Sequence, residues 1–292
     1  MAGLTRRVEA WRREGSVERV AGRNLWVRRR SGEGPLLLFL HGFPSSSYDW
    51  RRLLELEADP ASIAFDFLGF GLSEKPRGHD YSLFEQADLT EALVADGGGP
   101  VIAIGHDMGT SVATELMARD IEDRLGFELV GVLLFNGSIV AELASLTLGQ
   151  KLLLSRAGPV LARLASRRFF VQQLGGVFSA AHPLTDEEAA DQWALVCANG
   201  GRTLGHHQVA YYRERIQHAD RWHGALRDWE GELHYAWGLG DPVATPVMLR
   251  AVSELRPQAP VTELPELGHY PQIEDPAQIA AATRRLAEST RE

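Results

Sequence analysis

An aspartate, Asp107, occupies the centre of the run Gly105-His106-Asp107-Met108-Gly109, between an apolar stretch at 101–104 and a helical pattern at 110–118. The spacing is that of a nucleophile elbow, a strained strand–turn–helix junction that exposes its central side chain and usually carries a serine there. The N-terminus of the following helix favours a negative charge at position 107. An ordinary N-cap aspartate is the alternative interpretation of this junction.

Two further side chains lie where a nucleophilic aspartate needs partners. Asp241, in the run Gly-Leu-Gly-Asp-Pro at 238–242, and His269, in Leu-Gly-His-Tyr-Pro at 267–271, each follow an apolar strand pattern. Asp241 would orient the imidazole of His269 and stabilise its charged form. A turn aspartate and a surface histidine are each common alone. Their order along the chain, nucleophile then acid then histidine, favours a catalytic set.

The type of nucleophile predicts the reaction. A carboxylate that attacks an sp³ carbon forms a stable alkyl ester on Asp107 and expels an epoxide oxygen or a halide. His269 would then activate water to hydrolyse this ester. The backbone N–H groups of Phe43, in the run His-Gly-Phe-Pro at 41–44, and of Met108 are placed to form an oxyanion hole for that second step. Because the histidine acts as a base, another group must handle the leaving group.

Composition excludes several other classes of protein. A formal net charge of −9 argues against a nucleic-acid partner. The single cysteine, Cys197, excludes an intramolecular disulfide and a cysteine-based zinc site. No apolar run reaches the roughly 18 residues that span a bilayer, and the arginine-rich N-terminus lacks the apolar core of a signal peptide. These last two observations predict a cytoplasmic protein. Phosphate loops and metal-ligand clusters are also missing, so the sequence predicts no cofactor and no metal.

The elements that must position these residues follow from apolar patterns. Continuous apolar runs predict buried strands, and helical spacing follows several of them, so the chain is predicted to form a mostly parallel, doubly wound α/β sheet. Between 139 and 226 no buried strand pattern occurs, and short helical stretches are interrupted by glycine and proline. We therefore expect a core at 1–138 and 227–292 and an inserted helical cap (lid) at 139–226. The predicted strands are 25–30, 36–40, 62–67, 101–104, 129–135, 232–237 and 260–264.

Four long segments of the sequence match a known group of proteins. They are residues 41–50 (HGFPSSSYDW), 66–76 (DFLGFGLSEKP), 81–87 (YSLFEQA) and 269–276 (HYPQIEDP). Through them the chain resembles the aspartate-nucleophile α/β-hydrolases, which include epoxide hydrolases and haloalkane dehalogenases. Within this family it is most similar to the mesoderm-specific transcript (MEST) type of epoxide hydrolase-like protein. The resemblance implies the α/β-hydrolase fold.

The resemblance also bears on the leaving group. Haloalkane dehalogenases usually carry a halide-binding asparagine where this chain has Phe43 and a tryptophan where it has Met108, and neither side chain here donates a hydrogen bond. The arginine that fluoroacetate dehalogenases place after the nucleophile is also replaced by Met108. The His-Gly-Phe-Pro loop is similar to that of epoxide hydrolases. Asn136, after the strand at 129–135, is not an acid, which leaves Asp241 as the orienting acid.

Epoxide hydrolases use cap tyrosines to protonate the opening epoxide oxygen, and this cap offers Tyr211 and Tyr212. Neighbours on a helix point about 100° apart, so we expect only one to face the site. Tyr211 is preferred because it aligns with the single tyrosine of the MEST-like cap helix. Tyr212 as the donor, or packing of both rings in the cap, stays open.

The early cap lacks the second tyrosine that is typical of epoxide hydrolases, and His206 or His207 could substitute, although a solvated surface position is the alternative for both. His106, beside the nucleophile, is expected to pack under the elbow. Four side chains are expected to line the substrate pocket: His41, Trp50, Phe169 and Phe170.

The sequence therefore predicts an enzyme that opens a small-molecule epoxide to a vicinal diol. A haloalkane or haloacid dehalogenase with the same ester chemistry is the first alternative. A non-catalytic hydrolase-fold binding protein is the second, and the complete set of Asp107, Asp241 and His269 argues against it. A homodimer is considered as well, and the sequence does not fix the oligomeric state.

Overall fold

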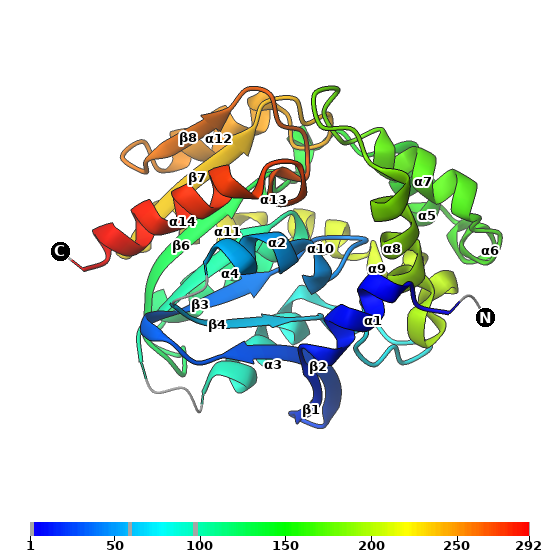
Figure 1. The fold of residues 1–292 in the computed structure, drawn as a ribbon. Helices are drawn as coiled ribbons and strands as arrows, with labels where there is room; N and C mark the ends of the chain where they lie inside the picture. The colour runs from blue at the N-terminus through cyan, green and yellow to red at the C-terminus, as the bar shows by residue number, and fades with distance from the viewer. Residues whose placement is uncertain (1–2, 58–59, 96–98, 292) are drawn as a thin grey trace.

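A computed structural model describes residues 3–57, 60–95 and 99–291. An eight-stranded sheet lies at its centre, in the order β1-β2-β4-β3-β5-β6-β7-β8 (Figure 1). The pairs β1–β2 and β2–β4 are antiparallel, and every pair from β4 onward is parallel. The strands are β1 (Ser16–Val20), β2 (Arg23–Arg30), β3 (Glu33–Leu40), β4 (Pro60–Phe65), β5 (Val101–His106), β6 (Leu129–Phe135), β7 (Glu232–Gly238) and β8 (Val261–Leu264).

The central strands are apolar along their length because helices cover both faces of the sheet. Successive side chains of a strand point to opposite faces. Thus Leu38 and Leu40 of β3 join one core cluster, and Leu37 and Phe39 join the other. The predicted α/β-hydrolase fold class is confirmed by this arrangement and by the comparisons given below.

Two helical layers pack on the sheet. One face carries α3, α4, α11 and α12, whose buried side chains share a core with β3 and β6. The other face carries α1, α2 and α14, with the short α13 beside them. The bounds are α1 (Arg6–Arg13), η1 (Ser47–Trp50), α2 (Arg51–Leu56), α3 (Leu83–Val94), α4 (Met108–Ile121), α11 (Ala219–Asp228), α12 (Pro246–Leu255), α13 (Pro271–Glu274) and α14 (Pro276–Ser289).

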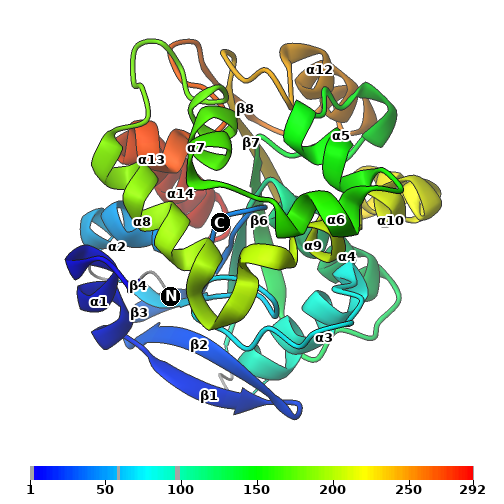
Figure 2. The same ribbon diagram turned by 90° about the vertical axis from the view of Figure 1, so that its right-hand side faces the viewer.

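Between β6 and β7 the chain is helical, and no strand forms in this stretch, all of whose residues are described. The helices α5 to α9 gather at one side of the molecule, and α10 and α11 lie closer to the sheet (Figures 1 and 2). The last of them, α11, packs on α4, and Trp222 of α11 is buried in the same core as α4. The other elements are η2 (Ala141–Leu143), α5 (Leu148–Leu154), α6 (Gly158–Arg163), α7 (Arg167–Gly175), α8 (Asp186–Cys197), η3 (Ala198–Thr203), α9 (Gly205–Gln208) and α10 (Tyr211–Gln217).

One strand, β1, was not predicted from the sequence. The edge strand β1 has a single fully buried residue, Val20, so its side chains lack the apolar signal on which strand prediction depends. The division into core (1–138 and 227–292) and cap (139–226) stays a prediction about domain organisation. In the part of the chain that is described, no helix combines the length and apolar character needed to cross a bilayer.

Candidate active site

The elbow between β5 and α4 holds Asp107 in a strained backbone conformation. Its φ of 45° and ψ of −108° lie outside the ordinary regions for a residue with a side chain. The flanking glycines make this turn possible. A Cβ on Gly105 would lie 2.8 Å from the carbonyl oxygen of Gly109, and one on Gly109 would collide with the carbonyl oxygen of Leu40. The chain therefore presents a carboxylate at the carboxyl end of the central strands.

The carboxylate of Asp107 lies against the predicted oxyanion hole. The backbone N–H of Phe43 donates to Oδ2 of Asp107 at 2.8 Å. Met108 is the first residue of α4, so its N–H is one of the helix donors that has no partner within the helix. The loop after β3 thus brings the amide of Phe43 to this carboxylate, and the amide of Met108 follows Asp107 at the start of α4.

His269 and Asp241 lie together, although 28 residues separate them. Nδ1 of His269 lies 2.7 Å from Oδ2 of Asp241, and the imidazole is buried. Burial favours the neutral ring, but the charge of Asp241, its hydrogen bond and the charge of Asp107 together raise the pKa of His269. Because Nδ1 faces Asp241, Nε2 is the nitrogen left to act on a water molecule.

Two buried side chains fix this pair in place. Nδ2 of Asn136 donates to Oδ2 of Asp241 at 2.8 Å, and Oδ1 of Asn136 accepts from the N–H of Gly238 at 2.9 Å. The Nε2 atom of His106 lies 2.7 Å from the carbonyl oxygen of His269. Burial first, and then the neighbouring His269, hold the pKa of His106 well below its usual range, so His106 is neutral and donates here. Asn136 therefore holds the carboxylate of Asp241 in place and does not take over its position beside His269.

The structure separates the two cap tyrosines. Tyr211, the first residue of α10, is 1% exposed, and its ring centre lies 5.8 Å from that of Phe43. Burial and then the negative charge of Asp107 raise the pKa of Tyr211, so its hydroxyl keeps its proton at neutral pH. Tyr212 points elsewhere, and its hydroxyl donates to the carbonyl oxygen of Ala141 at 3.0 Å. Of the two tyrosines, Tyr211 is therefore the one that lies near Asp107.

A buried arginine, Arg215, lies directly beneath Asp107. Its Nη2 donates to the backbone oxygen of Asp107 at 2.7 Å and lies 3.9 Å from Oδ1 of that residue. Its Nε donates to Oγ of Ser111 at 2.7 Å, and its guanidinium carbon lies 4.6 Å from the ring centre of Tyr211. Sequence analysis missed Arg215. The signal was its spacing, because Arg215 lies four residues after Tyr211 and so shares its helix face.

A second polar group that sequence analysis missed is Gln150. Its Oε1 accepts from the N–H of Thr147 at 2.9 Å in a capping box at the start of α5. Its side-chain hydrogen bond with the hydroxyl of Tyr211 lowers the pKa of that hydroxyl against the effect of burial. Gln150 comes from the early cap, where a second tyrosine was expected and is lacking.

A cavity of about 330 Å³ adjoins this site. Phe43, His269 and Tyr270 line it on one side, and Phe169 and Phe170 of α7 line it on the other. The other walls come mainly from apolar residues of α5, α6 and α7.

Two of the predicted pocket residues are not among those that line the cavity. His41 is buried, and its ring bonds the carbonyl oxygen of Gly42 and the N–H of Phe67. Burial lowers the pKa of His41 to about 3, so the ring is neutral and holds the loop in place. Trp50 is fully buried, and its ring centre lies 5.3 Å from that of Phe39. Both side chains belong to the scaffold, because Trp50 packs on the central strands β3 and β6 and His41 holds the loop after β3.

The proposed substitutes for a second tyrosine, His206 and His207, are also not among the lining residues of this cavity. Their rings lie 4.1 Å apart, on α9. In the part of the chain that is described, no group of three or more histidine, cysteine, aspartate and glutamate side chains could hold a metal ion.

The fold and the site together define a hydrolase class, and comparison with known proteins names it. Residues 37–282 match the alpha/beta hydrolase family, to which the chain therefore belongs. The "Putative hydrolase LipZ" of Mycobacterium tuberculosis is 51% identical over 280 residues, which cover 96% of this chain and 97% of that protein. The mesoderm-specific transcript protein of Mus musculus is 36% identical over 255 residues, which cover 84% and 76% of the two chains. The predicted family resemblance is confirmed.

Among solved structures, the haloalkane dehalogenase DbeA from Bradyrhizobium elkani matches with a TM-score of 0.79. The match covers 95% of this chain and 98% of that chain at 22% sequence identity. Identity at this level shows a shared fold and leaves the substrate open.

Proposed function

We propose that this chain is an epoxide hydrolase that works through an alkyl ester on Asp107. The observation that carries the proposal is the pairing of a carboxylate at the elbow with a buried, proton-bearing tyrosine, Tyr211, beside it. A carboxylate nucleophile requires an sp³ carbon, and an epoxide oxygen requires a proton as it leaves. Neither Phe43 nor Met108 offers a side-chain donor for a halide.

In the first step, an Oδ atom of Asp107 attacks an epoxide carbon, and the bond between this carbon and the ring oxygen breaks. The ring oxygen takes the hydroxyl proton of Tyr211. The positive charge of Arg215 beneath the Tyr211 ring and the amide of Gln150 stabilise the phenolate that remains. The cap thus supplies the acid that the Asp107, Asp241 and His269 set lacks.

In the second step, Nε2 of His269 takes a proton from water, and the hydroxide attacks the carbonyl carbon of the Asp107 ester. The N–H groups of Phe43 and Met108 stabilise the resulting oxyanion. Asp241 stabilises the imidazolium that forms. Collapse of this intermediate breaks its bond to the alkyl oxygen, and the proton of the new carboxyl group passes to that oxygen, which restores the carboxylate and releases the diol. The imidazolium of His269 then gives its proton back to the phenolate of Tyr211.

One observation favours a second function, that of a dehalogenase. The hydroxyl of Tyr211 and the amide of Gln150 are two neutral donors that meet beside the nucleophile, and such a pair can also bind a halide. The alkyl ester and its hydrolysis by His269 would be the same. We prefer the epoxide because the hydroxyl of Tyr211 carries a proton beside Asp107. In addition, the loop after β3 carries Phe43, which offers no side-chain donor to a halide.

The test uses a His269→Gln variant, which should form the ester and fail to hydrolyse it. The variant is incubated with a mixed panel of epoxides and haloalkanes, and the intact mass is measured. A gain equal to a whole epoxide supports the proposal. A gain equal to a haloalkane minus hydrogen halide shows the dehalogenase instead. No adduct in a folded protein contradicts both mechanisms for the compounds of the panel.

A further inference from the structure

The early cap differs in charge from the rest of the chain. Residues 143–185 contain five basic side chains and neither aspartate nor glutamate, within a chain of net charge −9. All five are exposed, and none takes part in an ion pair within the described residues. Elsewhere, by contrast, Arg119 and Arg221 each bind carboxylates. The five residues are Lys151, Arg156, Arg163, Arg167 and Arg168.

Exposed apolar side chains lie among these cations. Leu148 is 58% exposed, Val160 is 58% exposed and Leu164 is 71% exposed, and no large apolar side chain of the described residues is more exposed than Leu164. They come from α5 and from α6 and the residue that follows it. We call this set of three apolar and five basic residues the cap surface. Clustered exposed apolar side chains mark a site of interaction.

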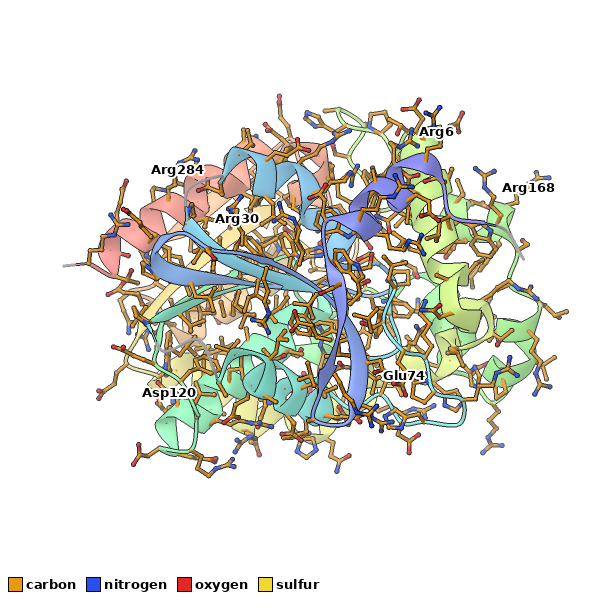
Figure 3. All side chains as sticks on the ribbon, turned by 60° about the horizontal axis from the view of Figure 1, so that its bottom comes forward. Arg6, Arg30, Glu74, Asp120, Arg168 and Arg284 are labelled. Carbon is orange, nitrogen blue, oxygen red and sulfur yellow. The ribbon has the colours of Figure 1, made fainter. Side chains whose placement is uncertain are left out.

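The cap surface projects from the body of the molecule. The helices α5, α6 and α7 gather at the side of the molecule away from the C-terminus (Figures 1 and 2), and α5 contacts both α6 and α7. The side chain of Arg168 points outward at this edge (Figure 3). Nothing in the described chain covers these three apolar side chains.

The cavity beside the catalytic residues opens through the same surface. Leu164 lines the cavity although most of its side chain is exposed, so it stands at the mouth. Arg202 also lines the cavity and is exposed, and its Nη1 donates to the carbonyl oxygens of Arg163 and Ala165. The mouth therefore lies at the junction of α6 and α7, between cations and apolar side chains.

We infer that the cap surface docks on an anionic lipid bilayer and aligns the cavity mouth with it. Apolar side chains among exposed cations are the combination that binds such an interface, because the former enter the acyl boundary and the latter approach the phosphates. Without the five cations of the cap surface the chain has a formal net charge of −14, so an anionic bilayer favours the orientation in which the cap surface faces it. An apolar substrate dissolved in the bilayer then enters the cavity without crossing water. Docking is measured without turnover, so it is tested independently of the proposed function.

The experiment measures co-sedimentation of the protein with two kinds of vesicle, phosphatidylcholine alone and phosphatidylcholine mixed equally with phosphatidylglycerol. Binding to the mixed vesicles only, weakened by added salt, is expected. Each arginine near the surface changes the partition coefficient about fivefold, so a variant with Arg163→Glu, Arg167→Glu and Arg168→Glu is expected to lose at least about a hundredfold.

A matched control has the same net charge and changes exposed arginines outside the cap: Arg19→Glu, Arg52→Glu and Arg250→Glu. This control should bind the mixed vesicles at most several-fold more weakly than the wild-type chain does. A second pair of variants tests the apolar side chains. The triple variant Leu148→Ser, Val160→Ser and Leu164→Ser is expected to lose vesicle binding. Its control, the triple variant Val17→Ser, Ile121→Ser and Val247→Ser, is expected to keep it.

Equal loss in a variant and its control, or no binding of the wild-type chain to the mixed vesicles, overturns the inference. The inference is also overturned if the wild-type chain does not bind vesicles but self-associates with rising concentration, and if the Leu148, Val160 and Leu164 variant does not self-associate. The cap surface is then an interface between two copies of the chain. Thermal unfolding of each variant confirms that it is folded.

Discussion

Replacement of Tyr211 by phenylalanine isolates the proton that the mechanism requires. The variant keeps the ring, and with it the contact with Phe43 and the stacking on Arg215. It loses only the hydroxyl and the hydrogen bond with Gln150. Tyr212→Phe is the matched control, because it removes a hydroxyl from the neighbouring position and loses one hydrogen bond, to Ala141.

The two variants should have similar stabilities and different rates. Loss of one hydrogen bond costs about 1 kcal/mol in the free energy of unfolding for either variant. A general acid contributes about 10²- to 10⁴-fold, which corresponds to about 3–5 kcal/mol of transition-state free energy, and only Tyr211→Phe should lose this. Because burial and Asp107 raise the pKa of Tyr211, wild-type alkylation should show no decline on the basic side below about pH 10.

The assay follows ester formation alone, in a single turnover in the His269→Gln background with intact mass as the readout. Tyr211→Phe should slow the appearance of the adduct by at least about a hundredfold, and Tyr212→Phe should leave it within a few-fold of the parent. Chemical denaturation of both variants shows whether their stabilities match.

An unchanged rate of ester formation in Tyr211→Phe would refute the assignment of Tyr211 as the acid. Equal slowing in both variants would show that the cap helix responds to any change at these positions, which would also refute a specific role. A slow rate in Tyr212→Phe alone would move the assignment to Tyr212.

Three further predictions concern the groups around Asp107. Hydrolysis of the ester should slow as pH falls through the raised pKa of His269, because only the neutral ring is a base, and Asp241→Asn should move this decline to lower pH in a stopped-flow pH profile. Arg215→Met should lower the free energy of unfolding by about 1.5–3 kcal/mol for each charged hydrogen bond lost, and it should also slow ester formation. Arg215→Lys should recover part of the stability and part of the rate. Chemical denaturation measures the first effect, and single-turnover mass measures the second. Gly109→Ala should lower the midpoint of thermal unfolding sharply, since the added Cβ collides with the carbonyl oxygen of Leu40; an unchanged midpoint would contradict the close approach of β3 and α4.

Local patterns were enough to predict most of the scaffold. The buried strands β3, β5, β6 and β7 have continuous apolar sequences, because helices cover both faces of a parallel sheet, and each was predicted to within a few residues. The edge strand β1 was missed because its exposed side chains are mostly polar. His41 and Trp50, the two predicted pocket residues that do not line the cavity, lie in the segment that follows β3, and the sequence does not show which side chains of this segment face the cavity.

The elbow, the loop after β3 and the order of Asp107, Asp241 and His269 could be predicted from short runs, because glycine spacing and strand ends fix the local backbone in each. The sequence did not show which of the two tyrosines lies near the carboxylate, or that Arg215 and Gln150 join it. These contacts link α10 to α4 and α5 to α10, which are elements far apart along the chain. Their distances depend on how the helices pack over the sheet, and no local pattern in the sequence specifies that packing.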